Sequence, residues 1–491
     1  MNLLKKLSIS TLLVGLSLSL TSCGGDSGNK EEVKKDSEEI PTITYYDVGT
    51  PQEDTGEVVE AINEYLDKSD AGYHLNLQFF DWGEYEQRLQ LASNAGDDWD
   101  IAFTANWSGP YKNLVEKGAF ADITDLIDEK GQAIKDSLSE DVLKGASIEG
   151  RLYGAPAAAK NVVPGNYFVW NKAYVDKYKI DIDSVKTIKD LEPYLKEVKE
   201  NEASVDYPFN IVSDFLLQTP TPQSEATPGV AVKEENGKLI AYNSWADPEL
   251  KKQLDVLKDY MDKGYINPSA PQMNAGDGEE GDRWLVTKAE GGPDSDGIWS
   301  NSFKSEVISS PAGNKTIVTN QKATGSLAAI NSQSEHKELA MDFLNRMYSD
   351  KELMRYLTYG IEGKHYDLVD GKVEKYEDTK YDVPAFTFLA SENMTPLTTS
   401  EDQDTPEAKE KLDKFLENLE PSPILGFNFD RKSVESEAGN VEQTIFEYEK
   451  NLKTGAFDED YYQEFLDKLN TAGIDKLIEE VQNQLDNWDR K

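Results

Sequence analysis

The fold class follows from three short apolar segments, ITYYDV (43–48), YHLNLQFF (73–80) and WDIAFT (99–104). Their aromatic, β-branched and alternating apolar residues predict three β-strands. Between them lie the stretches 55–67 and 85–95, whose apolar residues recur at helical spacing. Strands that alternate with helices predict βαβ units around a mainly parallel sheet, so we expect an α/β fold.

Polar and aromatic residues stand where these predicted strands end. In parallel sheets, ligands bind beyond the carboxyl ends of the strands, in the loops that follow. The three loops begin at Asp47, Asp81 and Thr104, and two of them carry Trp82 and Trp107. We therefore expect a binding site at this edge of the sheet.

The N-terminus has the pattern of an export signal. Lys5 and Lys6 precede an uncharged run, residues 7–20, and Cys23 follows in the sequence LTSC. This resembles a bacterial lipobox, in which the cysteine thiol takes a diacylglycerol, with fatty acids such as palmitate, and the signal, here residues 1–22, is cut just before the cysteine. The alternatives are an ordinary signal peptide or a short membrane helix, but a spanning helix needs about 20 apolar residues.

Residues 24–39 contain one apolar side chain, Val33, so they cannot offset the entropy of ordering. We expect residues 23–40 to be a flexible tether. The folded part would then lie on the extracytoplasmic face of the cell membrane, anchored only by the N-terminal lipid.

Composition limits the possible functions. The 491 residues suggest two to four domains, and the formal net charge of −41 argues against binding nucleic acid, whose phosphates would be repelled. The single cysteine and three scattered histidines, His74, His336 and His365, predict neither thiol chemistry nor a His-based metal site. We expect no cofactor and no metal.

Further elements follow along the chain. Apolar periodicity predicts helices over 187–200, 247–263 and 335–348, and a strand within 325–331. The last hundred residues are predicted to be mostly helical, over 405–419, 433–453 and 459–489.

The order of several motifs resembles a known family. The motifs are LYGAP (152–156), NYFVWNKAYVDKY (166–178), DGIWSN (296–301) and TGSLAAINSQSEHKELAMDFLNRMYSD (324–350). Together with the lipobox, they resemble the solute-binding lipoproteins of carbohydrate ABC importers, in the maltose-binding-protein-like cluster. The segments YGIEGKHY (359–366) and 426–455 resemble a LipO-like subgroup with an extra helical C-terminal domain.

The resemblance implies a two-lobed, periplasmic-binding-protein-like fold with a hinge between the lobes. Lobe one would comprise residues 41–160 and 322–352. Lobe two would comprise residues 161–321 and 353–491, including the helical region from about 400. The protein would be a monomer that captures an oligosaccharide between the lobes and delivers it to ABC permease subunits, without catalysing a reaction.

A sugar presents apolar C–H faces and a rim of hydroxyl groups, so its site needs flat aromatic rings and planar polar groups. The candidates are those at strand ends, at the presumed crossing between lobes and in glycine-rich loops. They are Asp47, Asp81, Trp82, Trp107, Lys160, Asn161, Tyr167, Trp245, Trp299, Glu362 and His365. Core packing is the competing explanation for each aromatic ring, and a structural turn is the competing explanation for Glu362 and His365.

Other functions remain open at this point. The negative charge would suit a polyamine, and a peptide is a further possible solute. An exported glycoside hydrolase needs a pair of carboxylates in a cleft, which 92 acidic residues could always supply. However, the sequence shows no Gly-x-Ser-x-Gly elbow and no His-Glu-x-x-His motif.

Overall fold

The computed structural model describes residues 40–157, 165–215, 217, 224–274, 281–293, 295–313, 316–389 and 406–490. The predicted signal peptide, residues 23–39 of the predicted tether, Lys160 and Asn161 lie outside these residues. No helix among the described residues combines the length and the apolar character that a membrane crossing requires.

The first sheet has five strands in the order β2-β1-β3-β12-β4. Their bounds are β1 (Thr42–Val48), β2 (His74–Phe80), β3 (Ile101–Thr104), β4 (Ala155–Pro156) and β12 (Leu327–Ile330). β1 pairs in parallel with β2 and β3, whereas β12 pairs antiparallel with β3 and β4. The three strands predicted at the start of the chain are confirmed, and the strand predicted within 325–331 joins the same sheet.

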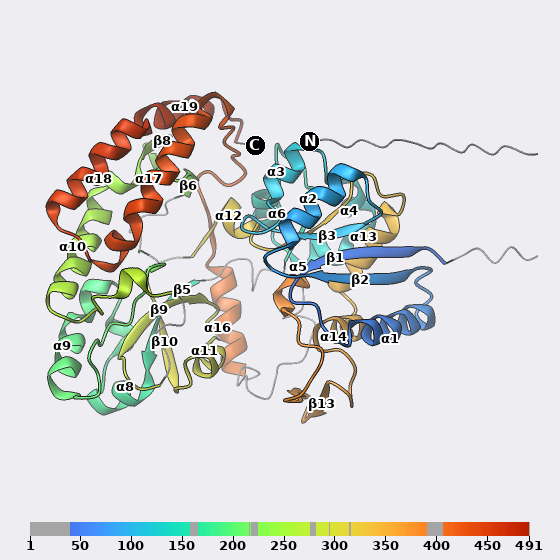
Figure 1. Ribbon diagram of the computed structural model, residues 1–491, viewed down its shortest axis with the longest axis horizontal. Helices are drawn as coiled ribbons and strands as arrows, with labels where there is room; N and C mark the ends of the chain where they lie inside the picture. Colours follow the sequence, from blue (N-terminus) through green and yellow to red (C-terminus); the bar gives the residue numbers. More distant parts are fainter. Residues whose placement is uncertain are drawn as a thin grey trace, which may run out of the picture. The chain divides into compact units, whose positions relative to one another are not determined.

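Helices pack around this sheet (Figure 1). They are α1 (Thr55–Lys68), α2 (Tyr85–Ala95), α3 (Tyr111–Glu116), α4 (Thr124–Lys130), α5 (Gln132–Ser137), α6 (Glu140–Ala146), α13 (Lys337–Met347) and α14 (Lys351–Tyr359). Helix α1 shows why they form: Val58, Ile62 and Leu66 are four residues apart, share one face and are all buried. β3 and β12 are buried along their whole length, as expected for central strands covered on both faces.

The first core extends beyond the predicted lobe one. Leu353 and Met354 on α14, and later Tyr381 and Phe388, belong to the same buried cluster as the five-stranded sheet. The expected boundary places residues 353–491 in lobe two, whereas the buried residues within 353–389 share the core of the first sheet. The reason is that α14 follows α13 directly in the chain and packs its apolar face against the first core.

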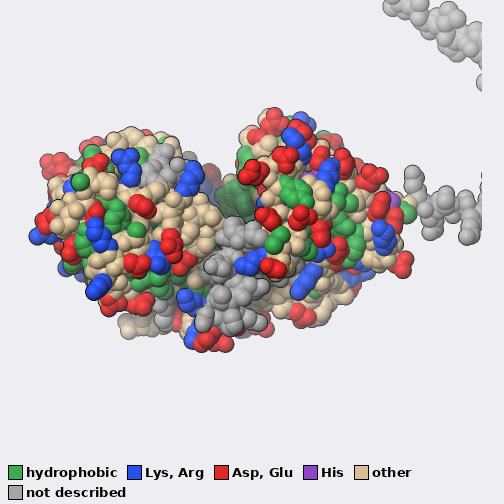
Figure 2. Space-filling model, turned by 90° about the horizontal axis from the view of Figure 1, so that it is seen from below, with side chains coloured by type: hydrophobic (Ala, Val, Ile, Leu, Met, Phe, Trp, Pro, Cys, Tyr) green, Lys and Arg blue, Asp and Glu red, His purple; other side chains and the backbone are tan. Residues whose placement is uncertain are grey.

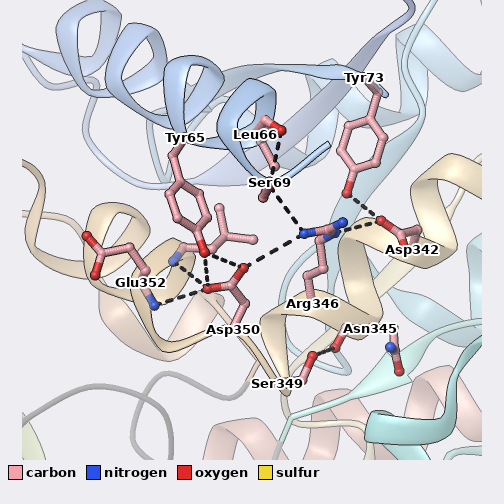
Figure 3. A network of polar contacts seen from close by, with 11 residues as sticks. Tyr65, Leu66, Ser69, Tyr73, Asp342, Asn345, Arg346, Ser349, Asp350 and Glu352 are labelled. Carbon is pink, nitrogen blue, oxygen red and sulfur yellow. Dashed lines mark hydrogen bonds and ion pairs between the residues drawn. The ribbon is translucent and has the colours of Figure 1, made fainter. Parts of the chain in front are cut away.

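A polar network links α1 to the corner between α13 and α14 (Figure 3). Arg346 lies between two carboxylates, with Nε 2.8 Å from Asp342 and Nη1 3.9 Å from Asp350. The Tyr65 hydroxyl donates to Asp350, and the Tyr73 hydroxyl donates to Asp342. Asp350 also caps α14, because its side chain accepts hydrogen bonds from two backbone N–H groups of the first turn.

A second sheet has three antiparallel strands, β10 (Val307–Pro311), β5 (Gly165–Asn171) and β9 (Val286–Gly291). The helices of this region are α8 (Lys172–Tyr178), α9 (Glu192–Asn201), α10 (Pro248–Asp262) and α11 (Asp296–Phe303). The predicted helices 187–200 and 247–263 correspond to α9 and α10. Phe168, Trp170, Leu195 and Leu257 belong to one buried cluster here, so side chains from the sheet, α9 and α10 share a core.

The C-terminal helices share a core with a third sheet. This sheet consists of β6 (Ser224–Thr227), β7 (Val230–Glu235) and β8 (Lys238–Asn243), and the helices are α17 (Glu435–Thr454), α18 (Glu459–Ala472) and α19 (Ile474–Asn487). The predicted single helix 459–489 is two helices. Gly473 separates them with φ +103°, a left-handed conformation that ends α18, and a Cβ there would lie 2.7 Å from the Glu437 side chain.

Shorter elements complete the described chain. They are β11 (Ile317–Val318), α12 (Asn320–Ala323), β13 (Tyr366–Val369), β14 (Lys372–Lys375), α16 (Pro406–Glu417) and β15 (Glu420–Pro421). β11 pairs with β15, and β13 forms a hairpin with β14. α16 confirms the helix predicted over 405–419.

We predict that Asp350→Ala lowers the free energy of unfolding by about 2–3 kcal/mol, because it removes both a helix cap and the acceptor of the Tyr65 hydroxyl. Asp350→Asn is the matched control, since asparagine also caps helices, and its loss should be smaller. Urea denaturation of the folded part measures both. Equal losses in the two variants would contradict the proposed role of the cap.

Candidate functional site

Three exposed aromatic rings lie side by side where chain segments leave the first sheet. Trp82 follows β2, Trp107 follows β3, and Phe386 belongs to the 3-10 turn Ala385–Thr387. Their side chains are 46%, 51% and 40% exposed. The ring centroids are 6.1 Å apart for Trp82–Trp107, 6.2 Å for Trp82–Phe386 and 6.1 Å for Trp107–Phe386. We call these three residues the aromatic platform.

The Trp107 ring is fixed by the segment that precedes β12. Its Nε1 donates to the Gly325 carbonyl at 2.7 Å. The neighbouring Asn106 donates from its backbone to Thr324 and from its side chain to Gln321, both at 2.8 Å. These bonds hold the ring while half of its surface stays exposed, as a stacking surface for a ligand requires.

Asp81 and Trp82 lie in a tight turn after β2. The Asp81 carbonyl accepts from Glu84 at 2.8 Å and from Tyr85 at 3.0 Å, which starts α2. The Asp81 side chain is exposed and accepts weakly from Gly83 at 3.3 Å. The structure therefore brings together three predicted site residues, namely Asp81, Trp82 and Trp107.

Phe386 was not predicted as a site residue. It stands in the segment PAFTF (384–388), where Phe386 is exposed while Phe388 is fully buried. The Phe388 ring meets Tyr45 edge-on at 6.4 Å and Phe79 at 6.3 Å. Alternating phenylalanines of this kind signal one buried and one exposed ring, but the sequence does not show that this segment returns to the strand ends near Trp82.

The structure places Asp47 beneath the platform rather than on its surface. Its side chain is fully buried and accepts from the Thr387 hydroxyl at 2.8 Å and from the Val48 backbone at 2.8 Å. Burial raises the pKa of this carboxyl to about 7, although both hydrogen bonds act in the opposite direction. The Asp47 side chain therefore faces the protein interior, where it supports the segment that carries Phe386.

Tyr167 and Trp299 lie together in the second sheet region. Their ring centroids are 5.7 Å apart, and both side chains are mainly buried, with Trp299 8% exposed. The Trp299 ring packs against Gly291, where an added Cβ would approach it to 2.6 Å. The neighbouring Ile298 is the exposed apolar side chain of α11. Core packing therefore explains most of the Trp299 environment.

Trp245 is part of the C-terminal core. Its ring meets Phe465 edge-on at 5.3 Å, and its carbonyl accepts from the Tyr462 hydroxyl at 2.7 Å. Trp245 and Phe465 belong to the same buried cluster. The structure does not bring Trp245 next to the platform rings; Trp245 packs mainly in this core and also lines a pocket to which Asn106 contributes.

His365 is buried in a structural turn, whereas Glu362 is exposed. The His365 Nδ1 accepts from the Ile361 backbone at 2.8 Å, so Nε2 carries the hydrogen that it donates to Asp54 at 3.1 Å. The hydrogen bonds from Lys364 and His365 lower the pKa of Asp54. Glu362 lies 4.0 Å from Arg355. These contacts support the interpretation of His365 as part of a turn.

The surface carries many acidic groups. Figure 2 shows Asp and Glu side chains spread over the face in view, with Lys and Arg between them, in a chain of formal net charge −41. Among the residues with described coordinates, no group of three or more His, Cys, Asp or Glu side chains is placed to hold a metal ion.

We predict that Asp47→Asn stabilises the protein increasingly as the pH rises from 5 to 8. Asp47 has a pKa of about 7 in the folded state and about 4 in the unfolded state, so the folded protein binds the proton more tightly. The contribution of Asp47 to the free energy of unfolding therefore decreases as the pH rises from about 4 to about 7. The advantage of Asn should approach at most about 4 kcal/mol above pH 7. Thermal unfolding at several pH values measures this advantage. A stability difference between wild type and Asp47→Asn that does not change with pH would contradict the raised pKa of Asp47.

Comparison with known proteins gives two matching families. Residues 58–361 match the family described as bacterial extracellular solute-binding protein. Residues 423–490 match a domain of unknown function, DUF3502, which corresponds to the end of the chain from the segment before α17 to α19.

Individual relatives are similar over nearly the whole length. A carbohydrate ABC transporter substrate-binding protein of Streptococcus pneumoniae is 28% identical over 490 residues, which cover 98% of this chain and 97% of that protein. The crystal structure of an N-glycan transport solute-binding protein from S. pneumoniae is 27% identical, with a TM-score of 0.79, covering 91% of this chain and 98% of that one.

A structure of that N-glycan transport protein in complex with Man5GlcNAc has a TM-score of 0.68 and 27% identity, with coverage of 91% and 98%. The two-lobed binding-protein fold expected from the motifs is thus found in proteins that match most of this chain. The family match spans more than half of the residues, so the chain belongs to the bacterial extracellular solute-binding proteins.

Proposed function

We propose that this protein is the substrate-binding subunit of a carbohydrate ABC importer and that it captures an oligosaccharide on the aromatic platform. The observation that carries the proposal is the triangle of exposed rings, Trp82, Trp107 and Phe386, at the strand ends of the first sheet. Flat exposed rings suit the C–H faces of sugars, because stacking removes apolar area of both partners from water.

Polar groups next to the rings suit the sugar hydroxyls. The Asp81 carboxylate is exposed beside Trp82, and the Thr50 hydroxyl lies 3.5 Å from it. A carboxylate that accepts from two adjacent hydroxyl groups forms charge-assisted hydrogen bonds, which are stronger than neutral ones. We propose that Asp81 fixes the orientation of the sugar that stacks on Trp82.

The relatives support a saccharide rather than another solute. The curated relative is a carbohydrate transporter component, and the similar crystal structures belong to an N-glycan transport protein, one of them with bound Man5GlcNAc. We therefore propose a mannose- and N-acetylglucosamine-containing oligosaccharide as the first ligand to test. The proposed role requires binding and release and no covalent chemistry.

The site of action is proposed from the sequence. Cys23 would carry the lipid that anchors the protein to the extracytoplasmic face of the cell membrane, and residues 24–39 would tether the folded part. The protein would act as a monomer and would deliver its ligand to separate permease subunits. We also keep the boundaries of the two lobes as a proposal, with residues 353–389 moved to lobe one because they share its core.

We predict that Trp82→Ala and Trp107→Ala each weaken Man5GlcNAc binding by about 5- to 30-fold, since each removes about 1–2 kcal/mol of stacking. Isothermal titration calorimetry of residues 40–491 measures the affinity. Phe446→Ala is the matched control, because Phe446 is an exposed ring on α17, outside the platform, and its loss should leave the affinity unchanged.

The same titration separates the alternatives. Unchanged affinity in both tryptophan variants would move the site away from the platform. Binding of spermidine or of a peptide, with no response to any oligosaccharide, would keep a solute-binding protein and overturn the sugar. Release of free sugar during incubation with Man5GlcNAc would indicate a hydrolase and contradict the proposal.

We predict that Cys23→Ala abolishes incorporation of radiolabelled palmitate and moves the protein from the membrane fraction to the medium. Cys23 is the only cysteine in the chain, so no other residue offers a thiol to which the lipid could be attached. Labelling in a bacterial host, followed by fractionation, measures both effects. Retention of the variant in the membrane fraction would indicate an uncleaved N-terminal anchor instead.

A further inference from the structure

A chain of buried contacts runs from β1 to the exposed ring of Phe386. The Asp47 carboxylate accepts from the Thr387 hydroxyl at 2.8 Å, and both side chains are fully buried. Thr387 follows Phe386 directly, so the position of its side chain sets the backbone that carries the platform ring. The same hydroxyl lies 2.9 Å from the Pro384 carbonyl, which closes the turn Ala385–Thr387.

The backbone of Phe386 is held from a second side. The Ser326 hydroxyl, in the segment leading into β12, donates to the Phe386 carbonyl at 3.0 Å. The adjacent Gly325 carbonyl accepts from the Trp107 ring. Two rings of the platform are therefore tied to neighbouring residues, Gly325 and Ser326, and their separation is set by one short piece of backbone.

A carboxylate at position 47 is costly for stability. It is buried near the tyrosines Tyr45 on β1, Tyr85 on α2 and Tyr381; burial raises the pKa of all three hydroxyls, and the Asp47 charge raises it further. A buried acid is destabilising unless its hydrogen bonds compensate. Among the described residues it accepts hydrogen bonds from Val48, its own neighbour, and from Thr387, which connects it to a distant segment.

We propose that Thr387, held by Asp47, is a positioning residue that fixes Phe386 in the aromatic platform and thereby sets the affinity for the sugar. This inference rests on the proposed function, because it assigns a role in ligand binding to the platform. Thr387 itself does not touch the ligand, since it is fully buried. It acts through the ring that precedes it.

A double-mutant cycle tests this role. Thr387→Val removes the hydroxyl and keeps the shape, and we expect it to weaken Man5GlcNAc binding by about 5-fold, within the range for removal of one buried hydrogen bond. In the Phe386→Ala background the same substitution should cause no further loss, because the ring that it positions is absent. Thr387→Ser, which restores the hydroxyl, should restore the affinity.

A matched control excludes a general effect of removing a buried hydroxyl. Thr358 on α14 is buried, and its hydroxyl has no hydrogen-bond partner among the residues described. Thr358→Val should therefore leave the affinity unchanged. The proposal is overturned if Thr387→Val leaves the affinity unchanged, or if it causes the same loss with and without Phe386.

Acrylamide quenching tests the positioning without any ligand. Of the eight tryptophans, Trp99, Trp170, Trp245, Trp284 and Trp299 are at most 8% exposed and Trp488 is partly buried, whereas Trp82 and Trp107 are about half exposed and contribute most of the quenching. Thr387→Val should raise the quenching constant about as much as Phe386→Ala, because both expose the neighbouring indoles. If the wild-type protein binds no oligosaccharide, the proposed function is wrong, whatever the quenching shows. Unchanged quenching in Thr387→Val would overturn the positioning role.

Discussion

The insertion of β12 between β3 and β4 is the constraint on which the rest of the site depends. Residues 327–330 follow the strands of the second and third sheets in the sequence and return to the first sheet. There they pair antiparallel with β3 on one side and β4 on the other. The strand is buried along its length, so its register is fixed by the core. That register positions Gly325 and Ser326, which bind the Trp107 ring and the Phe386 backbone.

The platform therefore combines three segments that are far apart in the sequence. Trp82 and Trp107 follow parallel strands, which explains why both occupy one edge of the sheet. Phe386 lies in the segment that follows α14 in the sequence, and the buried hydrogen bond between Asp47 and Thr387 holds this segment in place. A rigid arrangement of this kind lowers the cost of binding, because the rings need not be ordered when the ligand arrives.

Local patterns were sufficient to predict much of the fold. The strands β1 to β3, the helices between them and the helical C-terminal region all follow from apolar periodicity and turn residues. The positions of Trp82 and Trp107 follow from the rule that ligands bind beyond strand ends. Tertiary contacts decided the rest, because Phe386 depends on a long-range return of the chain. Asp47 lies on the buried face of β1, in alternation with Ile43 and Tyr45, and Thr387 provides its hydrogen bond there. Trp245 and Trp299 stand in loops in the sequence, but each packs within a core cluster.

A crystal structure of residues 40–491 with bound Man5GlcNAc would show directly whether the aromatic platform binds the sugar. We expect one sugar ring with its C–H face against Trp82 or Trp107, in contact with Phe386, and with a hydroxyl group bound to Asp81. An oligosaccharide bound elsewhere, with all three platform rings still exposed to solvent, would contradict this expectation.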